Sequence, residues 1–375
     1  MTKARIAVAG AGLIGRKHID VLRSGTADYE LAGVADPSPE AATEAAALGY
    51  PCFASLDDLL GETKPDGVII AVPNQLHVEL GLRCISAGLP ILIEKPVADS
   101  VTDALRLIEA AEAASIPTLT GHHRRHNPIM RRAVELIAEG RIGRPVTASV
   151  LWLAHKPKGY HDLAWRREPG GGPILINAIH DIDCLRMLLG DIDRVQAAQS
   201  NAVRGFAVED TAAAILTFKS GALATLLLSD TVSAPWSWET TSGENPAFPR
   251  TGQDAILVGG TKGSLAIPSL DLRWHEPGRE DWLEPLVQRR EPVIPADPYV
   301  EQMRNFANVI RGREAPVLTG RAGTVTLATT LAITVSAETG RPVAVDEVLA
   351  ARRPAVCSAT PQNPRAPTLR TVTHD

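Results

Sequence analysis

The feature that most restricts the fold of this chain is a glycine-rich turn near its start. A short apolar run, Ile6–Ala9, leads directly into Gly10, Gly12 and Gly15, and a helical pattern follows. Gly10 permits a tight turn, Gly12 lets the backbone approach a pyrophosphate, and Gly15 lets the helix pack on the strand. The pyrophosphate would lie on the free N–H groups of the helix N-terminus. We therefore predict dinucleotide binding, rather than an unrelated glycine-rich turn of another α/β protein.

An acidic residue at the end of the next apolar run refines this prediction. Leu31–Ala35 has the pattern of a second strand, and Asp36 follows it. A carboxylate at this position can accept hydrogen bonds from the adenosine ribose hydroxyls. It would also repel a 2′-phosphate, and Pro37–Pro39 supplies no arginine to bind one. NAD is therefore the predicted cofactor, in preference to NADP.

The first third of the chain alternates between strand and helix patterns, which is typical of a parallel, doubly wound sheet. The expected strands are Arg5–Ala9, Leu31–Ala35, Gly67–Val72, Pro90–Ile93 and Thr118–Thr120. The expected helices are Leu13–Ser24, Pro39–Leu48, Leu76–Ala87 and Val101–Ala114, with a short turn at Leu56–Leu60 and Ser100 as an N-cap. We predict an N-terminal Rossmann dinucleotide-binding domain over residues 1–121.

Residues 122–350 have a different pattern and are expected to form a second, substrate-binding α/β domain. The expected helices are Ile129–Glu139, Ile174–Leu189, Tyr299–Arg311 and Gly323–Thr339, and the expected strands are Val146–Leu153 and two hairpins over Ala212–Ser229 and Ala255–Ile267. The polar stretch Ser233–Gly252, which carries Trp236 and Trp238, is expected to be a surface loop or lid. Residues 351–375 are predicted to be a flexible tail.

Charge and hydropathy limit the expected partners. The chain has 375 residues and a net charge of −5, which argues against a general nucleic-acid or membrane-surface binder. No apolar run is long enough to span a bilayer, and Lys3 and Arg5 lead straight into a strand rather than a signal peptide. Four cysteines without CxxC spacing fit a reducing compartment and give no zinc signature. We expect a cytoplasmic protein with a small-molecule substrate, and no nucleic-acid or membrane partner.

Several further motifs match one known family. They are the glycine turn, Ala71–His77, Glu94-Lys95-Pro96, and Gly170–Gly172 leading to His180–Asp183. On these residues the chain resembles, from about residue 4 to about residue 345, the Gfo/Idh/MocA oxidoreductases (glucose–fructose oxidoreductase, inositol dehydrogenase and rhizopine catabolism). The resemblance implies a Rossmann domain followed by an α/β domain with a large, mostly antiparallel, open-faced sheet. It also implies a homodimer or homotetramer, because that sheet often buries one face against another subunit in the family.

The resemblance also implies which residues bind the cofactor. They are Gly10, Gly12, Leu13, Ile14, Gly15, Asp36, Val72, Pro73, Asn74, His77, Glu94 and Lys95. The positions of three of these residues support the assignment without the resemblance. Asn74, His77 and Glu94 follow strands at the edge of an open α/β sheet, where ligands bind. Asn74 has a second interpretation as a cap of the helix Leu76–Ala87.

Lys95 and His180 are the expected catalytic residues. Pro96 forces Lys95 into an extended conformation that can direct its amine into the cleft, and burial readily shifts the pKa of a lysine. His180 follows a glycine-rich loop, matches the family's catalytic histidine, and can act as a general base near neutral pH. The alternatives are a solvated surface lysine and a structural histidine.

One position departs from the family. Many members have an aspartate four residues before the histidine, where this chain has Ile176. Isoleucine cannot exchange protons, and the neighbouring Asn177 can hydrogen-bond a substrate but cannot act as a base. Because this aspartate is missing, the predicted proton transfer depends more on Lys95 and His180. The departure favours a variant subgroup over lost catalysis.

The expected substrate-binding residues are His123, Arg124, Tyr160, Trp165, Arg166, Asn177 and His180. The three histidines of His122–His126 match no zinc spacing, so no metal site is predicted. Trp165 could stack on a ring face and Arg166 could bind a carboxylate. A buried tryptophan and a solvated arginine are equally good interpretations. Together the arginines favour a substrate with a carboxylate or several hydroxyls.

The predicted function is an NAD-dependent dehydrogenase that transfers a hydride between nicotinamide and a secondary alcohol or ketone of a cyclic polyol, sugar or related ring compound. His180 would remove the hydroxyl proton, while Lys95 polarises the oxygen and relays the proton. Three alternatives remain open. They are a dehydrogenase of carboxylated cyclic dihydrodiols in aromatic catabolism, a non-catalytic NAD-sensing regulatory protein, and an NAD-dependent glycosidase.

Overall fold

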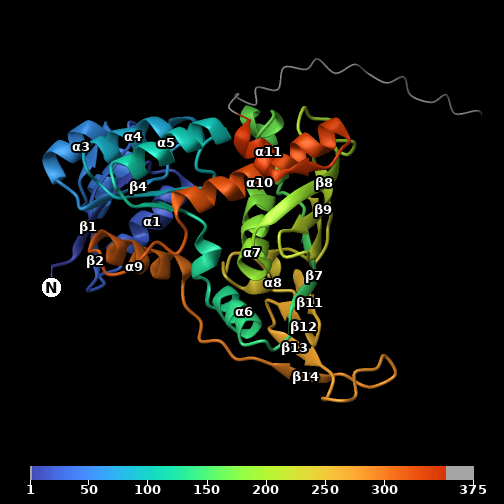
Figure 1. Cartoon of the computed structure of the whole chain (residues 1–375). Helices are drawn as coiled ribbons and strands as arrows, with labels where there is room; N and C mark the ends of the chain where they lie inside the picture. Colours follow the sequence, from blue (N-terminus) through green and yellow to red (C-terminus); the bar gives the residue numbers. More distant parts are fainter. Residues whose placement is uncertain (1, 352–375) are drawn as a thin grey trace, which may run out of the picture.

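The computed structural model describes residues 2–351, whose strands form two sheets (Figure 1). The first sheet is parallel, with strand order β3-β2-β1-β4-β5-β6. Its strands are β1 (Ala4–Ala9), β2 (Tyr29–Ala35), β3 (Cys52–Phe53), β4 (Gly67–Ile70), β5 (Ile91–Ile93) and β6 (Thr118–Thr120). Its helices are α1 (Leu13–Arg23), α2 (Pro39–Leu48), α3 (Leu56–Thr63), α4 (His77–Ser86) and α5 (Val101–Ala113). The predicted Rossmann architecture is confirmed.

Local sequence explains why these elements form. The central strands β1, β4 and β5 are apolar apart from the exposed Arg5 near the start of β1, as expected for a parallel sheet that is covered on both faces. Serine hydroxyls begin three of the helices: Ser38, Ser55 and Ser100 each accept a hydrogen bond from a backbone N–H in the first turn. The predicted Ser100 cap is therefore confirmed.

The second sheet has nine strands in the order β14-β13-β12-β11-β7-β10-β9-β8-β15. They are β7 (Pro145–Leu153), β8 (Ile192–Ser200), β9 (Thr211–Phe218), β10 (Leu223–Ser229), β11 (Ile256–Gly260), β12 (Gly263–Ile267), β13 (Asp271–Trp274), β14 (Val287–Arg290) and β15 (Val343–Ala344). Only β7 and β10 pair in parallel; every other pair is antiparallel. The expectation of a large, mostly antiparallel sheet is confirmed.

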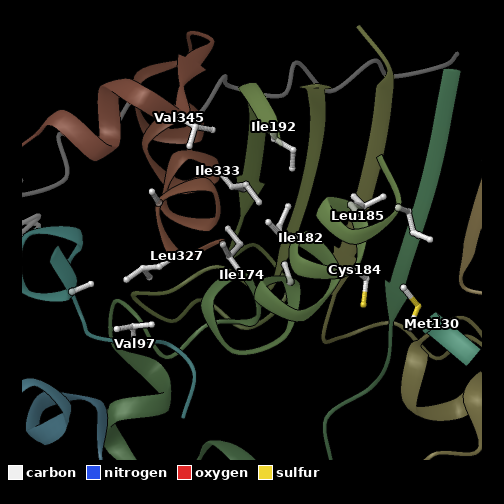
Figure 2. Packing of buried hydrophobic residues seen from close by; sticks show 14 of the residues in the cluster. Val97, Met130, Ile174, Ile182, Cys184, Leu185, Ile192, Leu327, Ile333 and Val345 are labelled. Atoms are coloured by element: carbon white, nitrogen blue, oxygen red, sulfur yellow. The ribbon is translucent and has the colours of Figure 1, made fainter. Parts of the chain in front are cut away.

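Helices cover one face of the second sheet. The helices of this part are α6 (Pro128–Ala138), α7 (Ile179–Leu189), α8 (Trp238–Ser242), α9 (Pro298–Ile310), α10 (Gly320–Thr339) and α11 (Val345–Ala350). Figure 2 shows Ile182 of α7, with Leu327 and Ile333 of α10, in the hydrophobic cluster beside the strands. Burial alternates along β9 and β10, so the opposite face of the sheet presents exposed apolar side chains. Four of them are Ile215, Leu223, Leu227 and Leu257.

Helix α9 returns to the first sheet after the chain has crossed the second one (Figure 1). Its Met303, Phe306 and Ala307 are fully buried in a cluster with residues of β1, β2 and β4. A Cβ on Gly67 would lie only 2.6 Å from Cδ1 of Ile310. The first sheet is therefore covered in part by a helix from far beyond residue 121, and the domain boundary at that residue stays a prediction.

Several local expectations were wrong. The stretch Ser233–Gly252 was expected to be a surface loop or lid, but its middle forms helix α8 and Trp238 is only 2% exposed; residues 245–250 do lie at the surface. The segment Ile174–Leu189 is not one regular helix, because residues Ile174–Ala178 form a π-helical turn before α7. Strands β3, β8, β13, β14 and β15 were not expected. The predicted tail after residue 351 lies outside the described residues.

Candidate active site

The glycine turn forms a cradle between β1 and α1. Gly10 has a φ of +96°, and a Cβ there would lie 2.5 Å from the carbonyl oxygen of Ala71. A Cβ on Gly15 would lie 2.0 Å from the oxygen of Gly10, so helix and strand pack too closely for any side chain. A Cβ on Gly12 would meet nothing within 4 Å. The space beside Gly12 is therefore open, as a bound pyrophosphate requires.

The first turn of α1 completes this cradle. The N-terminus of the helix has no side-chain cap and no acidic residue in its first turn, so its N–H groups are free for an anion. Leu13 and Ile14, both expected at the cofactor, are 85% and 36% exposed despite being apolar. The residues that the structure places here therefore fit a dinucleotide.

Asp36 is fixed at the end of β2. Its Oδ2 accepts the N–H of Ala11 at 2.7 Å, and its Oδ1 accepts the N–H and hydroxyl of Ser38 at 2.9 and 2.6 Å. Burial acts to raise the pKa of Asp36, but these hydrogen bonds outweigh it and the pKa is lowered. The carboxylate is thus charged at neutral pH. The nearby cation Arg16 is paired with Glu44 at 2.8 Å.

The segment after β4 is tied to the segment after β5 through His77. The imidazole is fully buried, with Nδ1 2.9 Å from the oxygen of Pro96 and Nε2 2.9 Å from the oxygen of Val72. Its side chain therefore holds two loops together and is not available to a cofactor. Asn74 begins a short 3-10 turn and makes no capping bond to α4, so the cap interpretation was wrong. Pro73 precedes that turn at the surface.

Glu94 lies directly after β5 and forms a buried ion pair that the sequence did not predict. Its Oε1 lies 2.7 Å from Nε2 of His18, which comes from α1. Burial acts to raise the pKa of Glu94, but the partner histidine lowers it below the usual value. A Cβ on Gly121 would lie 2.7 Å from this carboxylate. Glu94 therefore joins α1, β5 and the end of β6 under the site.

Lys95 reaches across to the second part of the chain. Its Nζ donates a hydrogen bond to the backbone oxygen of Ile176 at 3.1 Å. Burial lowers the pKa of Lys95 to about 8. Glu94 opposes this shift, whereas the cations Arg124 and Lys156 reinforce it. The amine can therefore exchange a proton near neutral pH, unlike a solvated surface lysine.

Lys95 contacts the backbone at the position where many family members have an aspartate. Ile176 lies in the π-helical turn Ile174–Ala178, where the regular helical hydrogen-bond pattern is interrupted. Its carbonyl oxygen can therefore hold the Lys95 amine in place. A backbone oxygen accepts the hydrogen bond but adds no negative charge, so it does not raise the pKa of the lysine as an aspartate would.

His180 lies at the start of α7, next to two further histidines. Its ring centre is 5.3 Å from that of His123 and 6.0 Å from that of His122, both in edge-on arrangements. Burial and the charge of Lys95 hold the pKa of His180 well below its usual value, so the ring is neutral. Its Nδ1 has no hydrogen-bond partner, and neither has the buried Oδ1 of Asn177. Both atoms are therefore available to a ligand.

His123 is held from two sides. Its Nε2 lies 2.9 Å from Oε1 of Glu244, and its ring stacks on Tyr299 of α9 with 4.6 Å between centres. Glu244 also accepts a hydrogen bond from Asn127 at 2.7 Å. Neither Glu244 nor Tyr299 was expected in the site. No group of histidine, cysteine, aspartate or glutamate side chains within residues 2–351 is arranged to hold a metal ion.

Arg124 differs from its expected role. Its guanidinium donates to Asp181 at 2.7 Å and to Glu239 at 3.0 Å, and it lies 5.2 Å from the ring centre of Trp238. The residue is only 2% exposed. Arg124 is therefore not free to bind a substrate carboxylate, and it acts as a fixed positive charge behind Lys95.

Tyr160, Trp165 and Arg166 come together on the loop after β7, as expected. The Arg166 guanidinium lies 3.9 Å from the ring centre of Tyr160 and 5.2 Å from that of Trp165. Trp165 is 53% exposed, so the interpretation as a core tryptophan was wrong. Lys156, which was not expected here, lies 4.5 Å from the Tyr160 ring centre.

Two family models match this chain. The model described as "Oxidoreductase family, NAD-binding Rossmann fold" matches residues 4–122, and "GFO/IDH/MocA C-terminal domain" matches residues 130–266. The two-sheet fold and the glycine cradle thus define the class of this protein, which is an NAD-binding oxidoreductase. The chain belongs to the Gfo/Idh/MocA oxidoreductase family, and the predicted family, enzyme class and NAD cofactor are confirmed.

Relatives of known name span most of the chain. The 1,5-anhydro-D-fructose reductase of Ensifer adhaerens is 32% identical over 298 residues, which are 78% of this chain and 83% of that enzyme. Inositol 2-dehydrogenase 2 of Saccharopolyspora erythraea is 31% identical over 224 residues, 58% of this chain and 64% of that enzyme. The WlbA dehydrogenase of Bordetella pertussis, solved with NADH and UDP-GlcNAcA, has a TM-score of 0.75 at 25% identity, covering 92% of this chain and 99% of that one. No helix within residues 2–351 has the length and apolar character to cross a membrane.

Proposed function

We propose that this protein is an NAD-dependent dehydrogenase that oxidises a secondary alcohol of a cyclic polyol, sugar or related ring compound, or reduces the corresponding ketone. The observation that carries the proposal is the hydrogen bond of Lys95, with its lowered pKa, to the turn that leads to a neutral His180, whose pKa the Lys95 charge helps to lower. Unpartnered Asn177 Oδ1 and His180 Nδ1 offer hydrogen bonds to a hydroxylated ligand. Relatives named as a sugar-derivative reductase and an inositol dehydrogenase support the same substrate class.

The pKa shifts of Lys95 and His180 favour catalytic roles that differ from those the sequence predicts. The low pKa of His180 makes its ring a poor proton acceptor while Lys95 is charged. Lys95, with a pKa of about 8, is the better acceptor of the hydroxyl proton in its neutral form. In this mechanism the His180 ring orients the reacting hydroxyl, and the Ile176 carbonyl keeps the Lys95 amine in reach. NAD, when bound, supplies the hydride acceptor.

The residues that would hold NAD are those of the cradle. The N–H groups of α1 and the open space beside Gly12 take the pyrophosphate, and Asp36 takes the ribose hydroxyls. Leu13 and Ile14 offer apolar contact, and the chain segment of Val72 and Pro73 lies at the neighbouring strand end. The side chains of His77 and Glu94 act indirectly, because each is engaged within the protein.

The direct test is reduction of NAD in the presence of inositols, aldoses, uronates and cyclic dihydrodiols, followed by the absorbance of the reduced nicotinamide. We expect turnover of at least one polyhydroxylated ring class. NAD binding with no turnover of any class would instead favour the sensing protein. Release of a free aglycone from a glycoside would favour the glycosidase.

Lys95 sets the expected pH dependence. Alcohol oxidation needs the neutral amine, so kcat/KM should rise about tenfold per pH unit below pH 8 and then level off. Ketone reduction needs the protonated amine, so kcat/KM in that direction should be level below about pH 8 and fall above it. Initial rates in both directions across neutral and alkaline pH, at constant ionic strength, check this. The same profile in both directions would contradict the assignment to Lys95.

We also propose that the open face of the second sheet is an interface between copies of this chain. Ile215 and Leu257 are each 52% exposed on that face, and Leu223 and Leu227 lie beside them on β10. An apolar patch of this kind on a sheet face favours association. Replacing both Ile215 and Leu257 by lysine should convert a dimer or tetramer into a monomer. Light scattering measures this change in mass. Leu48→Lys, on α2 of the other sheet, is the matched control and should leave the mass unchanged.

A further inference from the structure

A pair of cations next to Lys95 is not used by the mechanism above. Lys156 follows β7, and its Nζ lies 4.9 Å from the ring centre of Trp152 and 4.5 Å from that of Tyr160. The Arg166 guanidinium lies 3.9 Å from the same Tyr160 ring. Two positive charges thus share one aromatic ring, although like charges repel and neither forms an ion pair there; Glu239 and Asp230 act on the Lys156 charge only from a longer distance.

These cations lack carboxylate partners among residues 2–351. Lys156 Nζ has no aspartate or glutamate oxygen within ion-pair distance, and neither has Arg166. The guanidinium makes a single hydrogen bond, from Nη1 to the backbone oxygen of Tyr160 at 2.8 Å. Its Nε is buried and has no partner. Because a guanidinium carries five N–H donors, most of its hydrogen-bonding capacity is left for a ligand.

The loop that carries Arg166 is held in a fixed shape. A Cβ on Gly171 would lie 2.2 Å from the backbone oxygen of Trp165 and 2.8 Å from Cα of Arg166. Gly171 also donates its N–H to Glu168 at 2.9 Å. Close packing therefore fixes the backbone at Arg166, and the hydrogen bond to the Tyr160 oxygen with the stacking on the Tyr160 ring holds the guanidinium, which lowers the entropic cost of binding.

The pair is linked to the surroundings of Lys95 by charge and by hydrogen bonds. Trp152, under the Lys156 amine, donates its Nε1 hydrogen to Glu239 at 2.9 Å, and Glu239 also accepts from Arg124 at 3.0 Å. The charge of Lys156 contributes to the lowered pKa of Lys95. A ligand that reaches Lys95 would therefore lie within the field of Lys156, which in turn feels the charge of Arg166.

We infer that Lys156 and Arg166 form an anion subsite and that the substrate of the dehydrogenase is a carboxylated ring compound. This inference rests on the proposed function. The planar fork of Arg166 matches a carboxylate in geometry, and Lys156 adds a second positive charge. Glu239 is 24% exposed beside Lys156 and would repel a doubly charged phosphate more than a singly charged carboxylate. A carboxylate on the ring thus anchors one end of the substrate while Lys95 faces the reacting hydroxyl.

The test uses matched pairs of ligands, such as glucuronate with glucose and galacturonate with galactose, on the full chain loaded with NADH. Binding is measured by calorimetry, and turnover with NAD is measured in parallel. At least one acid should bind more than tenfold tighter than its neutral partner, and added salt should weaken this preference. Arg166→Met and Lys156→Met should each reduce the preference at least tenfold in binding and in KM, with a smaller effect on kcat.

Neighbouring residues provide the controls. Arg167→Met and Lys158→Met remove the same charges from exposed positions and should leave the preference unchanged. The inference is overturned if neutral sugars bind as well as the acids, if no acid binds, or if the preference survives both Arg166→Met and Lys156→Met. Turnover of neutral sugars alone would overturn the subsite and leave the dehydrogenase standing. Acid binding without any turnover would support the subsite and remove the dehydrogenase.

Discussion

Replacing Lys95 by methionine is expected to lower kcat roughly 10²- to 10⁴-fold, the usual range for loss of a positioned acid–base group. Methionine keeps much of the side-chain volume but cannot donate to the Ile176 oxygen or exchange a proton. NAD affinity should change little, because the glycine cradle and Asp36 are untouched. Steady-state rates with the best substrate and NADH titration by fluorescence measure the two quantities separately.

Lys158→Met is the control for this substitution, since Lys158 is exposed. It should retain normal rates. A second comparison is His180→Asn, which removes the orienting ring but leaves the proton acceptor, and should preserve the inflection near pH 8 at a lower rate. If Lys95→Met retained most of its activity, the proton-transfer role of this lysine would have to be abandoned.

Two glycine substitutions should separate cofactor binding from folding. Gly12→Ala places a methyl group where nothing in the protein lies within 4 Å, at a φ of −68° that alanine tolerates. The methyl group would occupy the space of the pyrophosphate, so NAD affinity should fall roughly 10- to 100-fold with an unchanged Tm. Gly15→Ala brings a methyl group within 2.0 Å of a backbone oxygen and should lower the Tm instead.

Calorimetric titration with NAD and thermal denaturation without it distinguish the two variants. The important contrast is that Gly12→Ala keeps its folded-state stability while Gly15→Ala does not. Normal NAD affinity in Gly12→Ala would show that the pyrophosphate does not lie on this turn, and would remove the basis for the cofactor site.

The sequence predicted those parts of the site that depend on local spacing. The glycine turn, Asp36 and the position of Lys95 after a strand are short-range signals, and the parallel sheet brings them to one edge. Hydrogen bonds between distant segments carry no such signal. The ion pair of His18 with Glu94 joins residues 76 positions apart, so no sequence pattern indicates it.

The environment of Arg124 could not be predicted for the same reason. Its two carboxylate partners lie 57 and 115 residues away, one of them in a stretch that looked like a surface loop. Strand β8 was missed because its buried Ile192 and Val195 are three residues apart, since an irregularity in the pairing with β9 breaks the alternation between them. Ile176 holds the Lys95 amine through its backbone oxygen rather than its side chain. A residue's identity does not reveal such a role.

The return of α9 to the first sheet has a consequence for how this protein can be made. Met303 and Phe306 cover apolar residues of β1 and β4, so the nucleotide-binding half has an incomplete core until the ribosome has synthesised more than three hundred residues. During that time the part of the sheet face that α9 covers is exposed, which favours aggregation or capture by chaperones. A gene fragment that stops at residue 121 would therefore not yield a portable NAD-binding module. Such a module would need α9 joined back to it, together with the start of α10, which packs on β6 and α5.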